Sequence, residues 1–209
     1  NGPPSPVDPA FCDTLALLTK TTIVTGHTVE VFKNGNETYP HLWKDLRAAR
    51  RSLTLQRYYC QPGRMADEFK SILLERAAAG VRILFLRDAF GSGALTKEYI
   101  EELEKGGIEI ASFRPTKWYH LFKVYHRSHI RVVVIDGTVG YTGGFGIDDK
   151  WLGDGEHKDQ WRDTNARFTG PAVLQHQATF AAGWAEATGT LLSGDLFFPE
   201  KGAHEEKGE

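Results

Sequence analysis

The stretch SHIRVVVIDGTVGYTGG, from Ser128 to Gly144, predicts two strands joined by a tight turn. The apolar run Val132–Ile135 favours a buried strand, and the pair Asp136-Gly137 after it is typical of a turn. Side chains alternate between the two faces of a strand, so His129 and Arg131 should share one face. The strand therefore starts with an imidazole beside a cation. This is either a polar strand end facing solvent or part of a reactive site.

On both sides of this stretch, strand and helix patterns alternate. We expect further strands at 52–59, 81–88, 108–113 and 161–170, and helices at 41–51, 65–80, 95–107 and from Pro171 onward. The Asn34-Gly35 pair also predicts a β-hairpin over residues 29–39. The alternation predicts an α/β fold, with a mixed, mostly parallel sheet and helices on both faces.

Length and composition indicate one ordinary globular domain. The chain has 209 residues, of which 41% are hydrophobic and 25% charged. We expect a flexible arm at 1–14, a single domain at 15–198 and a charged tail at 199–209. The net charge of −2 gives no overall electrostatic basis for binding nucleic acid.

Membrane and metal signals are weak in this sequence. We find neither an apolar run of the ~20 residues that a membrane span needs nor a signal-peptide pattern. The two cysteines, Cys12 and Cys60, have no metal or redox spacing. The sequence therefore predicts no transmembrane segment in this chain and no metal site.

The chemistry of the strand start suits phosphate. A neutral histidine is a nucleophile toward phosphorus, and a neighbouring cation stabilises the charge on the phosphate oxygens. An aspartate such as Asp136 can orient an imidazole, and the pair Gly143-Gly144 lets backbone approach a phosphate closely.

The spacing His-x-Arg-x4-Asp-x6-Gly-Gly resembles the His-x-Lys-x4-Asp-x6-Gly-Gly signature of the phospholipase D superfamily. Within it, the chain is most similar to the first half of bacterial cardiolipin synthases, over roughly residues 15–195. Other segments that carry the resemblance, in the family's order, are DLRAARRSLTLQRYY, ILLERAAAGVRILFLRDAFGS, GIDDKWLG, WRDTNARFTGPAV and GWAEATG.

The resemblance implies a two-motif, cofactor-free and metal-free phosphodiester transfer. One histidine forms a phosphohistidine, and the histidine of a second motif protonates the leaving alcohol and then activates the acceptor. His129 would fill one of these roles, Arg131 would bind phosphate together with Gly143 and Gly144, and Asp136 would hold the motif together. The implied partners are a phosphatidylglycerol-like phospholipid, a membrane surface, and a second phospholipase D half or a homodimer partner. The implied location is the cytoplasm or the cytoplasmic face of the membrane.

Three departures from the family pattern bear on activity. Arg131 replaces the lysine, keeping the charge but changing its shape. Gly146 replaces an asparagine that often contacts phosphate in the family. Only one motif is present, because the adjacent residues of 157–159 (His-Lys-Asp) lack the spacing and read as a solvated loop.

Two other features are candidates for supporting roles. Asp163 stands where the family usually has an acidic residue near the site; the alternative is a structural ion pair. The segment 114–127 mixes basic and aromatic residues, which suits an anionic lipid surface; the alternative is a packed loop.

Three functions remain open at this point. The first is phosphatidyl transfer of the cardiolipin-synthase kind. The second is a single-motif nuclease or other phosphodiesterase, which the net charge disfavours. The third is a degenerate, non-catalytic half that pairs with another half and binds anionic lipid.

Overall fold

The computed structural model describes residues 5, 7–89, 91–113 and 129–199. Seven strands form one sheet in the order β1-β7-β6-β5-β2-β3-β4. Their bounds are β1 Thr28–Lys33, β2 Ser52–Arg57, β3 Arg82–Asp88, β4 Glu109–Phe113, β5 Val132–Ile135, β6 Val139–Gly143 and β7 Thr164–Thr169.

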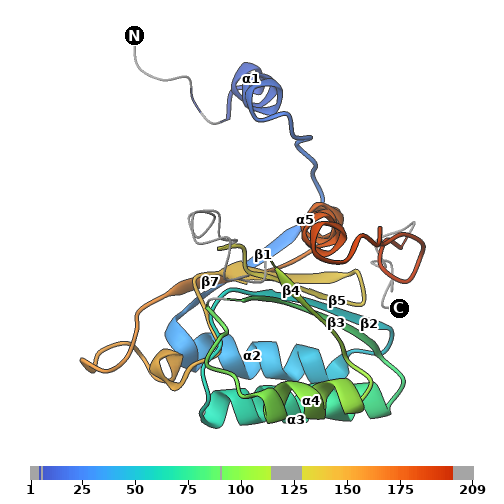
Figure 1. Ribbon diagram of the computed structural model, residues 1–209. Coiled ribbons are helices and arrows are strands. Elements are labelled where there is room, and N and C mark those ends of the chain that lie inside the picture. The colour runs from blue at the N-terminus through green and yellow to red at the C-terminus, as the bar shows by residue number, and fades with distance from the viewer. Residues whose placement is uncertain (1–4, 6, 90, 114–128, 200–209) are drawn as a thin grey trace, which may run out of the picture.

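Helices cover both faces of this sheet, as the sequence predicts. Figure 1 shows α2 (Asn34–Ala48), α3 (Arg64–Ala78) and α4 (Lys97–Lys105) on one face and α5 (Ala172–Thr188) on the other. Along β2 the odd-numbered Leu53 and Leu55 belong to the core under α2–α4, whereas Thr54 donates a hydrogen bond to Gln177 on α5. Odd-numbered residues of β2 therefore point to the face covered by α2–α4, and even-numbered residues point to the face covered by α5.

The sheet is mixed, but the expectation that it is mostly parallel is wrong. Only the pairs β2–β3 and β3–β4 are parallel, and the other four neighbouring pairs are antiparallel. The parallel pairs are those whose strands are joined through α3 and α4, since a helix crossover returns the chain in the same direction. The tight turn at Asp136-Gly137, confirmed here, makes β5 and β6 antiparallel instead.

The predicted hairpin at Asn34-Gly35 is also wrong. Asn34 has the left-handed backbone of a turn residue, with φ of 56°, but it opens α2 rather than a second strand. Its backbone N–H donates to the carbonyl of Asp163, and its side-chain oxygen accepts from the Asp163 N–H. These bonds tie the end of β1 to β7, which pairs with β1 from more than a hundred residues further along the chain.

The N-terminal helix α1 (Pro9–Thr19) stands apart from the sheet (Figure 1). The expected limit of a flexible arm, residue 14, falls inside this helix; the domain limits stay a prediction. Among the described residues, no helix has both the length and the apolar character to cross a membrane.

Candidate active site

The start of β5 lies beside the carboxyl ends of β2 and β3. Strand β5 runs antiparallel to β2 with Val132 opposite Gln56, and β3 runs parallel to β2. His129 and Arg131, which directly precede β5, are thereby placed next to the ends of two parallel strands. Loops at this position are common sites for ligands in α/β proteins.

The guanidinium group of Arg131 lies along the imidazole of His129. Its Nη1 is 3.3 Å from Nδ1 of His129, and its Nη2 is 3.5 Å from Nε2. Arginine only donates hydrogen bonds, so the ring nitrogen that it contacts must carry no proton. A neutral ring has one such nitrogen. A hydrogen bond from Arg131 is therefore compatible only with the neutral imidazole, and it would occupy the lone pair of the accepting nitrogen; the other close approach is then not a hydrogen bond.

The environment of His129 favours the same neutral form. Partial burial and the neighbouring Arg131 cation lower the pKa of His129 below its usual range, while the Asp88 carboxylate acts in the opposite direction. The ring of Tyr58, at the end of β2, lies against the imidazole with 4.4 Å between ring centroids. These features favour an oriented, neutral imidazole at the molecular surface. A nucleophile requires this neutral ring with its lone pair free, so Arg131 would have to move aside before attack.

The predicted glycines line the same end of the sheet. Gly143 ends β6 opposite Asn165 on β7, and a Cβ atom at Gly143 would overlap the Asn165 amide. A Cβ atom at Gly144 would overlap the carboxylate of Asp163. The two glycines thus let β6 pass close to polar groups of β7, and whether they contact phosphate stays a prediction.

Asp163 lies at the start of β7 with its carboxylate held in place. It accepts hydrogen bonds from the indole N–H of Trp151 at 3.0 Å and from the Thr164 N–H at 2.8 Å. Its charge raises the pKa of Arg131, whereas burial, the larger effect, lowers it. The structure therefore brings Asp163 into the electrostatic environment of the His129–Arg131 pair.

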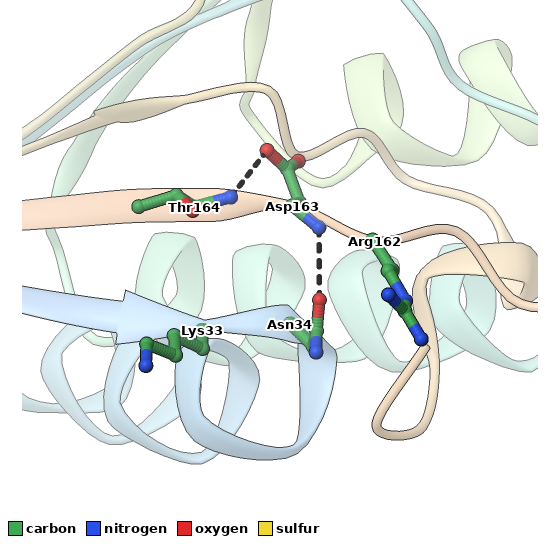
Figure 2. A pocket seen from close by; sticks show the side chains of 5 residues that line it. All are labelled: Lys33, Asn34, Arg162, Asp163 and Thr164. Atoms are coloured by element: carbon green, nitrogen blue, oxygen red, sulfur yellow. Dashed lines mark hydrogen bonds between the residues drawn. The ribbon is translucent and has the colours of Figure 1, made fainter. Parts of the chain in front are cut away.

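A shallow pocket of about 320 Å³ lies beside Asp163. Figure 2 shows Lys33 and Arg162 in its wall, with Asn34 bonded to the Asp163 backbone. The pocket thus has two cations and the Asp163 carboxylate in its lining.

Asp136 lies at the opposite end of β5 from His129. Its carboxylate accepts hydrogen bonds from the backbone N–H groups of Arg50, Arg51 and Ser52, at 2.8 to 3.2 Å. The interpretation that an aspartate here orients the imidazole is therefore wrong. The contacts instead attach the turn after β5 to the start of β2, which fits the role of holding the motif together.

The position of Gly146 has no room for an asparagine side chain. A Cβ atom there would lie 2.8 Å from the indole ring of Trp151, and the Gly146 carbonyl accepts a hydrogen bond from Tyr39.

The His157-Lys158-Asp159 triplet is exposed and away from regular structure, as expected. The basic and aromatic segment 114–127 lies outside the described residues.

The sequence reading missed Arg57, at the end of β2. Its side chain is 1% exposed and is among the largest fully buried ones. Leu53 and Leu55 face the core, and Arg57 is two residues further along β2, so its side chain points to the same buried face, beside Arg131.

Across the described part of the chain, no group of three or more His, Cys, Asp or Glu side chains is arranged to hold a metal ion.

Comparison with known proteins gives close relatives in sequence, although no protein-family model matches the chain. The cardiolipin synthase of Halalkalibacterium halodurans is 37% identical over 172 residues, covering 81% of this chain and 34% of the relative. Cardiolipin synthase A of Pseudomonas syringae is 37% identical over 177 residues, covering 83% and 37%. The chain thus spans about a third of the length of the curated relatives that it matches.

Solved structures share the fold at low sequence identity. Nuc from Salmonella typhimurium, described as a phospholipase D family member, has a TM-score of 0.59 at 12% identity, covering 78% of this chain and 97% of Nuc. The phosphatidylserine synthase of Haemophilus influenzae has a TM-score of 0.54 at 9% identity, covering 83% and 43%. The chain is therefore a homologue of bacterial cardiolipin synthases that has the fold of the phospholipase D family, as its motif predicts.

Proposed function

We propose that the chain catalyses phosphatidyl transfer between phospholipids, with His129 as the covalent nucleophile. The observation that carries this proposal is the His129–Arg131 pair: an imidazole with a lowered pKa and a guanidinium group in contact with it, in a homologue of cardiolipin synthases. The nucleophile and the cation for the phosphate oxygens are then adjacent before substrate binds.

The reaction has two displacements at phosphorus. In the first, a ring nitrogen of His129 forms a P–N bond, and the bond from phosphorus to the glycerol headgroup of phosphatidylglycerol breaks, with the glycerol oxygen taking a proton. In the second, a hydroxyl group of another phosphatidylglycerol loses its proton and attacks phosphorus, and the P–N bond breaks. The products are cardiolipin and glycerol, and no metal or cofactor enters either step.

The proton transfers need a second acid–base group opposite His129. The proposal assigns it to the histidine of a second motif, from another copy of the chain or another phospholipase D half. Because a phospholipid substrate lies in a membrane, the proposed reaction takes place at a membrane surface. We propose that this surface is the cytoplasmic face. If a second copy supplies the histidine, activity per chain should rise with protein concentration.

A transfer assay with vesicles containing phosphatidylglycerol tests the proposal. We expect cardiolipin and glycerol to appear in equal amounts, and a phosphohistidine to be trapped at residue 129 on acid-free quenching. Absence of both products at concentrations where the chain is shown to be dimeric would refute transfer by this chain alone. Addition of a separately expressed second half would then test the two-half arrangement.

Two further measurements separate the remaining alternatives. Release of nitrophenol from bis(p-nitrophenyl) phosphate without cardiolipin formation would indicate a general phosphodiesterase. Binding to anionic vesicles without turnover of either substrate would indicate a non-catalytic lipid-binding half.

A further inference from the structure

Arg57 is a buried cation whose guanidinium group has no hydrogen-bond acceptor among the described residues. Its Nε, Nη1 and Nη2 atoms are all inaccessible and make no hydrogen bond to any described residue. The ring of Phe145 lies 4.1 Å from the guanidinium carbon, which stabilises the charge in part but accepts no in-plane N–H bond. A buried charge with unmet donors is costly, so this arrangement indicates a missing acceptor.

Other cations lie next to Arg57 on the same face of the sheet. Arg87 on β3 is its direct partner in the parallel register, and Arg131 lies beside it, just before the antiparallel β5. Among the described residues, none of these three arginines forms an ion pair with a carboxylate within 4.0 Å. Three arginines are therefore neighbours beside His129, where the carboxylates of Asp88 and Asp163 also act on His129 and Arg131.

Arg57 remains charged at neutral pH although it is buried. Burial lowers its pKa to about 10, and repulsion from Arg131 acts in the same direction. Arg57 is thus a cation at neutral pH. An anion placed between the two guanidinium groups would relieve the repulsion and supply the acceptors that Arg57 lacks.

We propose that Arg57 is the inner cation of a phosphate site, in which a phosphate or phosphodiester group lies between the guanidinium groups of Arg57 and Arg131 and against His129. Planar guanidinium groups bind two oxygens of a tetrahedral oxyanion at once. The inference deepens the proposed function, on which it rests for the identity of the reacting group, but anion binding itself requires no turnover.

The contacts of Arg131 would let its guanidinium group move when phosphate binds. Arg131 is half-buried, and its guanidinium tip touches only the imidazole of His129 among the described hydrogen bonds, while its Nε has no acceptor. Phosphate bound to Arg57 would draw the Arg131 tip away from the ring. That movement would expose the ring nitrogen to phosphorus when the substrate is in place.

Thermal unfolding with inorganic phosphate tests the site, using the full chain and the Arg57→Met variant. We expect phosphate to raise the melting temperature of the wild-type chain, and Arg57→Met to weaken phosphate binding about 10- to 100-fold. Without phosphate the variant should be at least as stable as wild type, because an uncompensated buried charge is gone. Soluble short-chain phosphatidylglycerol, titrated in parallel, shows whether the site accepts free phosphate, the lipid diester or both.

Arg76→Met is the matched control, since Arg76 also has a buried Nε without an acceptor. It lies in the last turn of α3, just before β3 begins, and so at the end of the strands away from His129. The substitution should leave phosphate affinity unchanged. If Arg57→Met instead binds phosphate like wild type and loses stability, Arg57 is a structural residue of the core and the inference is wrong.

A measurement on the unsubstituted chain covers the case in which Arg57→Met does not fold. With isotope-labelled arginine, the Nε–H resonances of Arg57 and Arg131 should shift on adding phosphate, whereas that of Arg76 should not. An unmoved Arg57 resonance would overturn the inference even if the chain is an active transferase. Conversely, phosphate binding through Arg57 without any transfer would contradict only the proposed function.

Discussion

The two ends of β5 hold opposite electrostatic arrangements. At one end, the negative carboxylate of Asp136 accepts backbone hydrogen bonds from Arg50, Arg51 and Ser52. At the other end, the cations Arg57 and Arg131 lie side by side with unmet donors. The carboxylate at the first end accepts hydrogen bonds from described backbone groups, whereas the donors named at the second end have no acceptor among the described residues.

The difference separates two roles within one sequence motif. A charge whose partners are all backbone groups of its own fold stabilises that fold. Charges that lack partners destabilise the fold and persist where a ligand completes them. Substitutions at the two ends of β5 should therefore act on different quantities: stability at the Asp136 end and phosphate chemistry at the His129 end.

Replacing the nucleophile should have the largest effect. We expect His129→Gln to lower the transfer rate at least about a thousandfold, because no P–N bond can form. The side chain is exposed, so the free energy of unfolding should change by no more than about 0.5 kcal/mol. Rates on phosphatidylglycerol vesicles and urea unfolding curves measure the two quantities.

His157→Gln is the control for this substitution, since His157 lies in the exposed His-Lys-Asp triplet with its side chain 65% exposed. It should change neither rate nor stability. Comparable losses in the two variants would mean that the motif spacing does not identify the reactive histidine.

Asp136→Ala should show the reverse pattern. Three backbone N–H groups lose a charged acceptor, so we expect a loss of about 3 kcal/mol in the free energy of unfolding. The rate per folded molecule, measured well below the melting temperature, should stay near wild type.

Asp195→Ala is the control, since it breaks an exposed ion pair with Arg51. It should lower the free energy of unfolding by no more than about 1 kcal/mol. A stable Asp136→Ala chain that has lost transfer would place Asp136 in the chemistry instead.

The local part of this organisation is predictable from sequence. The turn at Asp136-Gly137 and the helices on both faces follow from short-range patterns, and the structure confirms them. Strand direction depends instead on which strands become neighbours. The Asn34-Gly35 pair illustrates this limit: Asn34 has the left-handed backbone that suits a hairpin turn, but β1 pairs with β7, far along the chain.

The site divides in the same way. Motif spacing places His129, Arg131 and the glycine pair at one end of the sheet, as the structure has them. It also groups Asp136 with them, although the length of β5 separates its carboxylate from the imidazole. Arg57 was missed because an arginine that ends a strand suggests exposure, and the contrary signal, its phase with Leu53 and Leu55, has meaning only once the buried face is known.

Arg131→Lys tests whether the transfer rate depends on the shape of the cation beside His129. Lysine keeps the charge but loses the planar fork that contacts the imidazole and that would grip two phosphate oxygens. We expect about a tenfold lower rate, with unchanged stability. Arg162→Lys, in the neighbouring pocket, should have little effect. A sharp rise in rate in the Arg131→Lys variant would mean that the native site is a weakened version of a lysine-based one.

The smallest effect concerns the pH dependence of transfer. His129 attacks only as the neutral ring, so the rate should fall as the pH drops through its pKa. Partial burial and then Arg131 lower that pKa below the ordinary value of 6.5, which puts the acid limb of the pH–rate profile below pH 6.5. Arg131→Met removes one of the two causes and should move the limb, and the His129 titration followed by NMR, to higher pH. Lys150→Met, a cation that lies over the ring of Trp161, should leave both where they are. An acid limb that stays fixed in Arg131→Met, while the NMR titration of His129 moves, would assign the limb to a group other than His129.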